Sequence, residues 1–574
     1  MKKYNHLLSF FIFFALAAII TFPLVKSGYI LTLDAVITPR VLFAPITSSS
    51  FIYQNILAVL NLFIPSDRIE RIILFLIFFL SGWGMYRFTD KNLRFARYFA
   101  GIFYAINPFV YERVMAGHWQ LLLGYSIFPY IVTLTMNYFH DSTKKNTVSL
   151  AIMATLLFNI AIHYLLIFMV FFITMGVTNA YLHRQNKEKL NKITRQTIFF
   201  IGLTFVLNAN WIISSILGIS DISQAIKSFT SGDLIAFQSV ADSRLGLIFN
   251  LLSGYGFWAE AYHYFLLPKD IIIFWPILSL AVILVFGIGL FRHIKEKSNI
   301  PILVTLPVLF LLALDIAGGV ALKSFAPTVF WLYEKFPILG GFREPQKLVG
   351  IVMFCYAYFG SFGLGKILAT IKGKTKLAAF SFFIILPFIY TPTVFGGFWG
   401  QLKPVWYPSS WEKVNQILKE DKSDFLTLFF PWHQYMRFKF ANDRVVSNPA
   451  LYYFDKPILS SQNYETTSLY SHDTRLESLH VEGLLSIEKE GVNLLGDLVE
   501  GNLPWGESLS PVNVKYIILT KDDDWVRYKF LDKQPDLTKV YEDENLVFYQ
   551  NMKWDLKDKQ LEEINFDEPL APLE

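Results

Sequence analysis

The chain has 574 residues, of which 53% are hydrophobic and 17% are charged, and its formal net charge is +5. Its apolar residues gather in blocks close to 20 residues long, the length that crosses a bilayer core of ~30 Å, which indicates a polytopic membrane protein and excludes an ordinary water-soluble fold. Cys355 is the single cysteine, which excludes an intrachain disulfide.

Eleven apolar blocks are long enough to be candidate spans. The first follows "MKK" and resembles a signal peptide, but it is long and has no small-residue cleavage site after it, so we expect a retained helix. The long run 147–182 is divided at "IHY" (162–164), and the short apolar segment 51–64 is expected to be interfacial or re-entrant. The expected spans are about 6–25, 70–88, 96–111, 119–139, 147–162, 164–182, 197–217, 271–291, 300–318, 347–369 and 377–396.

The distribution of Lys and Arg predicts the orientation of these spans. With a cytoplasmic N-terminus, the inside segments hold 20 basic and four acidic residues, whereas the rest of the chain up to residue 396 holds 12 of each. Basic residues near span ends are retained inside, so the N-terminus is expected in the cytoplasm. The connection "YERVMAGH" (111–118) then faces outward.

The character of the sequence changes after residue 396. Residues 397–574 contain no apolar run of membrane length, and acidic residues outnumber basic ones 30 to 19. Stretches such as "VKYIILT" and "NLVFYQN" are typical of strands, and "WEKVNQILKE" is typical of a helix. We therefore expect a transmembrane module over 1–396 and an extracytoplasmic α/β domain over 397–574, with an acidic tail after about residue 555.

Charged and polar side chains near the membrane are candidates for function because they are costly to place there. Several fall at the outward ends of predicted spans and so share one depth. Each also has a simpler explanation: Glu112 and Arg113 could pair with each other in a tight turn, His118 could cap a helix, and Lys347 could reach toward headgroups. The candidates are Asp34, Glu112, Arg113, His118, His163, Arg343, Glu344 and Lys347.

Motifs for metal, nucleophile and nucleotide chemistry are absent from the sequence. It contains no HExxH, paired CxxC, GxSxG or Walker lysine motif, and we expect no nucleic-acid partner. "DDD" (522–524) is interpreted as a solvated turn.

Several stretches resemble the GT-C superfamily of integral membrane glycosyltransferases. "YAINPFVYERVMAGHWQLLLGYSIFPY", "NANWIISSILG" and "FPILGGFREPQKLVG" are similar to YfhO-like membrane proteins and to the membrane module of mycobacterial arabinofuranosyltransferases. The ending "VKYIILTKDDDW" with "KVYEDENLVFYQNM" also resembles YfhO-like chains. One departure is that many GT-C enzymes carry an acidic pair in the first outer loop, whereas Asp34 stands alone. Cofactors are therefore open: a divalent metal is possible but no paired acidic motif supports it.

The resemblance implies transfer of a sugar from a polyprenyl-phosphate donor to an extracytoplasmic glycan, lipid or protein acceptor, with membrane lipid as a further partner. A leaving phosphate needs cations, and Arg113, Arg343 and Lys347 could supply them. An acceptor hydroxyl needs a base, and Asp34 is the candidate. The remaining four polar candidates would orient the substrate. Exposed aromatic residues of the outer domain are candidates for glycan contact, namely Trp432, Tyr452 and Tyr453.

Two other classes stay open. The chain could be a catalytically inactive scaffold of an envelope-assembly complex, which the lone first-loop acid favours. It could also be a transporter or flippase of lipid-linked sugars, although midplane charges and inverted repeats are not evident.

Overall fold

The computed structural model describes residues 2–227, 229–296, 299–463, 465–466, 469–470, 475–490 and 504–556. The chain forms two compact units. Unit 1 comprises Met1–Lys26 and Leu42–Lys403, and unit 2 comprises Ser27–Val41 and Pro404–Glu574. The expected acidic tail after about residue 555 lies almost entirely outside the described residues.

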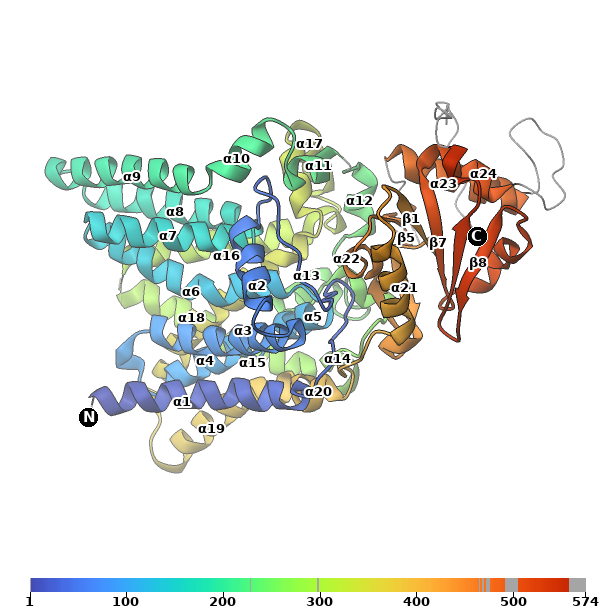
Figure 1. Ribbon diagram of the computed structural model, residues 1–574. Coiled ribbons are helices and arrows are strands. Elements are labelled where there is room, and N and C mark those ends of the chain that lie inside the picture. The colour runs from blue at the N-terminus through green and yellow to red at the C-terminus, as the bar shows by residue number, and fades with distance from the viewer. Residues whose placement is uncertain are drawn as a thin grey trace. The chain divides into compact units, whose positions relative to one another are not determined.

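Unit 1 is a bundle of long apolar helices (Figure 1). In the described part of the chain, eight helical segments are long and apolar enough to cross a membrane. Their helices are α1 (Lys2–Thr21), α3 (Ser66–Phe88), α6 (Trp119–His140), α8 (His163–Leu182), α15 (Trp275–Glu296), α16 (Ile300–Gly318), α18 (Val349–Thr370) and α19 (Gly373–Tyr390).

The remaining three expected spans take other forms. The block 96–111 is divided into α4 (Ala96–Ala105) and α5 (Pro108–Met115), because Pro108 disfavours helical geometry at Asn107, whose side chain caps α5 instead. The block 147–162 becomes α7 (Lys144–Ile160), which has only 17 residues. The block 197–217 becomes α9 (Lys187–Leu207) and α10 (Ala209–Ile216), and the helix axis bends by 78° between them. If this bent pair crosses the membrane as one segment, it is a ninth span.

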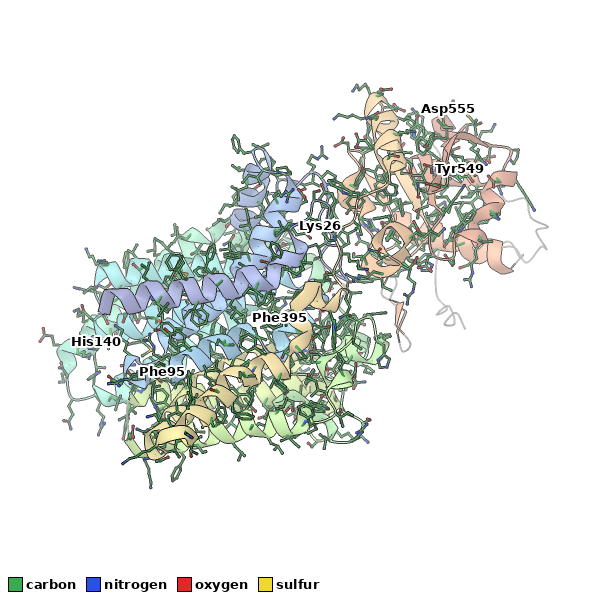
Figure 2. All side chains as sticks on the ribbon, turned by 90° about the horizontal axis from the view of Figure 1, so that it is seen from below. Lys26, Phe95, His140, Phe395, Tyr549 and Asp555 are labelled. Carbon is green, nitrogen blue, oxygen red and sulfur yellow. The ribbon has the colours of Figure 1, made fainter. Side chains whose placement is uncertain are left out.

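Shorter helices connect the long ones within unit 1. The apolar segment 51–64 forms α2, which has 11 residues and is too short to span; Figure 1 shows it running across the direction of α1. Phe95 and His140 lie at one end of the bundle, and Lys26 and Phe395 lie at the other (Figure 2). The short helices are α2 (Phe51–Asn61), α11 (Asp221–Lys227), α12 (Ser231–Ala236), α13 (Gly246–Leu252), α14 (Pro268–Ile271), α17 (Ala326–Lys335) and α20 (Phe395–Trp399).

Helix α18 is the most deeply buried of the eight long helices described and lies at the centre of the bundle. It packs directly against α15 through two glycines. A Cβ added to Gly363 would lie 2.0 Å from the carbonyl oxygen of Val285, and one added to Gly289 would lie 1.7 Å from that of Phe359. Small residues therefore let the two backbones touch, as is common in membrane helix pairs. This packing holds the second half of α18 against α15.

Unit 2 is an α/β fold built on a five-stranded sheet with the order β4-β1-β7-β9-β8. β1 is parallel to β4 and β7, and β9 is antiparallel to β7 and β8. A β2–β3 hairpin and a small β5–β6 pair stand apart from this sheet. The strands are β1 (Leu426–Phe430), β2 (Tyr435–Phe438), β3 (Arg444–Ser447), β4 (Ile458–Leu459), β5 (Glu465–Thr466), β6 (Leu469–Tyr470), β7 (Val514–Thr520), β8 (Leu537–Glu542) and β9 (Leu546–Asn551).

The sheet has a hydrophobic core on each face, because alternate residues of its strands point to opposite sides. On one face Phe429 and Ile518 pack with Trp411, and on the other Leu428 and Ile517 belong to a second core. The helices of unit 2 are α21 (Ser409–Glu420), α22 (Ala450–Tyr453), α23 (Leu476–Glu490) and α24 (Trp505–Leu509).

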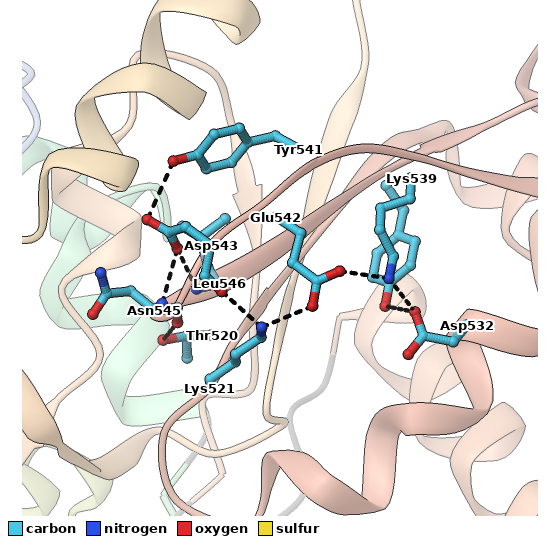
Figure 3. Close-up of polar contacts among 10 residues, drawn as sticks. Thr520, Lys521, Asp532, Lys539, Tyr541, Glu542, Asp543, Asn545 and Leu546 are labelled. Carbon is cyan, nitrogen blue, oxygen red and sulfur yellow. Dashed lines mark hydrogen bonds and ion pairs between the residues drawn. The ribbon is translucent and has the colours of Figure 1, made fainter.

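Charged side chains stabilise the β8–β9 end of the sheet (Figure 3). The Lys521 ammonium pairs with the Glu542 carboxylate at 2.8 Å. The Lys539 ammonium lies between two carboxylates, 2.6 Å from that of Glu542 and 3.0 Å from that of Asp532. At the turn, Asp543 accepts hydrogen bonds from the backbone N–H groups of residues 545 and 546. This carboxylate fixes the hairpin geometry in the way that Asp commonly does in turns.

The first loop of the chain, residues 27–41, folds as part of unit 2. Tyr29 and Val405 exchange backbone hydrogen bonds at 2.6 and 2.9 Å. The backbone N–H of Ser447 donates to the carbonyl of Leu33 at 2.8 Å, and the Tyr407 hydroxyl donates to that of Ile37 at 3.0 Å. The segment that carries Asp34 is thus bound along the α/β fold.

Candidate functional site

The structure brings together five of the polar residues selected from sequence, all within unit 1. Arg113 Nη1 lies 3.4 Å from Glu344 Oε2 and 3.1 Å from His118 Nδ1. Lys347 Nζ lies 3.4 Å from Glu344 Oε1 and 3.2 Å from His163 Nε2. We refer to these five residues as the cationic cluster.

The cationic cluster is buried. The Arg113 side chain is 1% exposed, and those of Glu344 and Lys347 are each 12% exposed. Burial alone would raise the pKa of Glu344, but Lys347, His118 and Arg113 outweigh burial and hold that pKa below its usual range. Glu344 is therefore an anion between two cations, and the formal charges of Arg113, Glu344 and Lys347 sum to a net positive charge.

Three long helices begin at this cluster. His118 is the residue immediately before α6, His163 is the first residue of α8, and Lys347 lies two residues before α18. Each helix N-terminus behaves as roughly half a positive charge and presents backbone N–H groups that lack partners within the helix. The helix termini and the two cations therefore both favour the binding of an anion at this place.

Arg343 lies beside the cluster. Its charge acts on Glu344, and its guanidinium carbon lies 5.1 Å from the ring centre of Phe237. Arg343 is thus held by an aromatic ring next to the cluster.

Glu112 and Arg113 interact with different partners, so the simple explanation of a local ion pair is not what the structure shows. Arg113 pairs with Glu344, 231 residues away. Glu112 is 2% exposed and lies near Glu260 and Lys269. Burial, together with repulsion from Glu260, raises the pKa of Glu112 well above its usual range.

Sequence reasoning missed a second buried group beside Glu112. Glu260 accepts hydrogen bonds from Lys269 Nζ at 2.5 Å and from Asn250 at 3.2 Å, and Lys269 also donates to Asn250 at 2.9 Å. The available signal was the charged residues Glu260, Lys269 and Asp270 in the largely apolar stretch "FWAEAYHYFLLPKD" (257–270). Such charges in an apolar segment indicate a buried partner.

Asp34 is exposed and belongs to unit 2, where its Oδ1 accepts a hydrogen bond from the Tyr435 hydroxyl at 2.6 Å. Of the three aromatic residues considered for glycan contact, Tyr452 is 50% exposed. Trp432 and Tyr453 are buried at 4% and 9% and belong to the hydrophobic cores. Tyr452 alone of the three presents an accessible ring.

The "DDD" turn has a structural role. Asp522 accepts a hydrogen bond from the backbone N–H of Lys439 at 2.9 Å, and Asp523 accepts one from Arg437 at 3.0 Å. Two of the three carboxylates are thus engaged by the edge of the β2–β3 hairpin. Within the described ranges, no three His, Cys, Asp or Glu side chains are grouped closely enough to hold a metal ion.

A separate apolar groove of about 460 Å³ lies between α6, α8 and α9. Phe139, Phe172 and Ile193 are among the side chains that line it, and it includes none of the residues discussed above. Its lining fits hydrocarbon, such as a lipid chain.

No family model and no curated protein matches the sequence. Solved structures do match: the cryo-EM structure of the arabinofuranosyltransferase AftD from Mycobacteria aligns with a TM-score of 0.60 at 13% identity, covering 94% of this chain and 40% of that chain. Two structures of a mutant of AftD align with TM-scores of 0.59 and 0.58 at 12% and 11% identity, covering 94% of this chain and 41% of theirs. The chain thus spans about two fifths of the length of the proteins it matches. The polytopic helical membrane fold expected from the sequence is confirmed, and the chain shares its fold with the AftD structures.

Proposed function

We propose that the protein is a membrane glycosyltransferase that moves a sugar from a polyprenyl-phosphate donor to a glycan, lipid or protein acceptor in cell-envelope biogenesis. The observation that carries the proposal is the cationic cluster at the start of α6, α8 and α18. The likeness to an arabinofuranosyltransferase supports it at the level of fold.

The cluster suits a phosphate that gains charge during the reaction. A sugar phosphodiester carries one negative charge, and the polyprenyl phosphate that leaves carries up to two. Arg113 and Lys347 lie on opposite sides of Glu344, and Arg343 lies beside them. Cations and helix termini already in place stabilise developing charge without reorganising, which is the largest contribution in many enzymes. We assign donor-phosphate binding to these three residues.

The neighbouring polar residues would orient the donor. Glu344 holds Arg113 and Lys347 in place, and His118 and His163 each contact one of these two cations. Glu112 precedes Arg113 in the chain, and burial raises its pKa, which favours the protonated form that can donate a hydrogen bond to a sugar or phosphate oxygen.

The transfer itself breaks the bond between the anomeric carbon and the phosphate oxygen, which keeps the electron pair. The acceptor oxygen forms the new bond and loses a proton to a base. We assign that base to Asp34, because it is an exposed carboxylate in the first loop of the chain with one oxygen held by Tyr435. A general base is typically worth ~10²- to 10⁴-fold in rate.

The proposal includes the orientation derived from the charge distribution. With the N-terminus in the cytoplasm, the start of α6, α8 and α18 faces the outer leaflet, and unit 2 lies outside the cell. A polyprenyl chain would then lie in the membrane beside unit 1, while the acceptor approaches from the extracytoplasmic side.

The test is an assay of the purified full chain with a panel of polyprenyl-phosphate sugars, comparing wild type with Asp34→Asn and Arg343→Ala. The proposal expects turnover with at least one donor, strong loss in Asp34→Asn and weaker donor binding in Arg343→Ala. The absence of turnover and donor binding across the panel would favour the scaffold. Equal turnover in all three proteins would refute these residue roles.

A further inference from the structure

Three buried aromatic rings lie between the two arginines assigned to phosphate binding. The Arg113 guanidinium carbon lies 4.0 Å from the ring centre of Phe257, and that of Arg343 lies 5.1 Å from the ring centre of Phe237. Trp258 joins the two rings, with centroid distances of 5.2 Å to each. Phe237, Phe257 and Trp258 form what we call the aromatic wall.

Glu260 binds the backbone of the loop that carries Phe257 and Trp258. Its Oε1 accepts hydrogen bonds from the backbone N–H groups of Phe257, at 2.9 Å, and of Gly256. Its other oxygen pairs with Lys269 at 2.5 Å. A carboxylate that accepts two amide hydrogen bonds fixes the backbone carrying the Phe257 ring.

Gly256 makes this loop geometry possible. Its φ is +103°, a region that residues with a side chain rarely adopt, and a Cβ there would lie 2.6 Å from the Leu251 side chain. The loop therefore has a defined conformation that directs both neighbouring amides at Glu260.

We propose that Glu260 and the aromatic wall are positioning residues that fix the two arginines before the donor phosphate binds. This inference rests on the proposed function, since it concerns the same phosphate site. Long arginine side chains lose rotamer freedom when they bind a ligand, and a ring face that already holds the guanidinium removes part of that cost. The buried Glu260–Lys269 pair supports the wall and does not itself bind phosphate.

The probe is farnesyl phosphate, titrated by calorimetry into the full chain in nanodiscs. Phe257→Leu removes the ring face that meets Arg113 but keeps an apolar side chain. Because a cation–π contact is worth about 2-fold in an equilibrium constant when exposed and about 30-fold when desolvated, we expect affinity to fall by a factor within that range. Phe128→Leu is the matched control, because Phe128 is fully buried against other aromatic rings. The Phe128→Leu variant should bind farnesyl phosphate with the affinity of wild type.

A second pair of variants separates positioning from general stability. Glu260→Gln with Lys269→Met removes the buried ion pair but keeps an oxygen for the two backbone amides, so it should bind like wild type. Glu260→Leu with Lys269→Met removes that oxygen as well and should lose affinity to the same extent as Phe257→Leu. If the leucine double variant does not fold, the comparison of Phe257→Leu with Phe128→Leu decides the question.

The outcomes are distinguishable. Wild-type binding that is unchanged in Phe257→Leu would overturn the positioning role and leave the phosphate site standing. A wild-type chain that does not bind farnesyl phosphate would overturn the phosphate site and this inference together.

Discussion

Arg113 and Glu344 form a buried ion pair although 231 residues separate them, with Nη1 and Oε2 3.4 Å apart. The pair joins the short helix α5 to the segment that leads into the central helix α18. Two segments remote in sequence therefore meet at the start of three membrane helices.

The first prediction concerns this ion pair. Glu344→Gln leaves Arg113 and Lys347 without the carboxylate between them, so it should destabilise unit 1 by about 3–5 kcal/mol. Arg113→Gln leaves Glu344 paired with Lys347 and should therefore cost less. The double variant should lose less than the sum, with a coupling of about 0.5–3 kcal/mol. Unfolding in detergent by chemical denaturant would measure the cycle, and strictly additive losses would show that the two side chains do not depend on each other.

The second prediction concerns Asp34. Asp34→Asn removes the proposed base and should lower turnover by about 10²- to 10⁴-fold while leaving the melting temperature close to that of wild type. Tyr435→Phe removes only the hydrogen bond at 2.6 Å and should retain most of the turnover. Rate measurements with a saturating donor test both, and an active Asp34→Asn variant would remove Asp34 from the mechanism.

The third prediction concerns the contact of α15 with α18. Gly363→Ala places a methyl group 2.0 Å from the Val285 carbonyl oxygen and should destabilise the bundle by about 1–3 kcal/mol. Gly287→Ala is the matched control, because nothing lies within 4 Å of its added Cβ. Thermal unfolding should separate the two variants, and equal stability would mean that the helices do not approach this closely.

The fourth prediction concerns the pH dependence of unit 2. Burial would raise the pKa of Asp421, but hydrogen bonds from Lys515 and Ser423 outweigh it and hold that pKa below its usual range. A lowered pKa in the folded state means that the stabilisation is complete above the unfolded-state pKa of ~3.9 and is lost as the pH falls through the folded-state value.

Asp421→Asn should therefore be less stable than wild type at pH 7, and the difference should shrink only below about pH 4. Hydrogen exchange of the β1 and β7 amides in the full chain would follow this. A difference that disappears between pH 7 and pH 5 would contradict the assignment to Asp421.

Much of the candidate site could be predicted from sequence because it lies at span ends. Counting apolar blocks placed Arg113, His118, His163, Glu344 and Lys347 at one membrane boundary, and the structure brings their side chains together. Hydropathy predicts the depth of each residue in the membrane. Few polar residues share the depth of the span ends, so the candidates for the site were few.

The remaining relationships could not be predicted because they depend on long-range backbone contacts. The first loop binds unit 2 through carbonyl groups that any sequence possesses, so nothing in residues 27–41 indicated where Asp34 would lie. The contact of Phe257 with Arg113 likewise arises only when the loop folds over α5. The expected span 96–111 is interrupted at Asn107–Pro108, because a count of apolar residues does not register the restriction that Pro108 places on the residue before it.

The most direct measurement is a cryo-EM structure of the full chain with a bound polyprenyl-phosphate sugar or its unreactive analogue. The account predicts phosphate density within hydrogen-bond reach of Arg113 and Lys347, at the first turns of α6, α8 and α18. Density for the phosphate at any other place, with the Arg113–Glu344–Lys347 contacts unchanged, would contradict it.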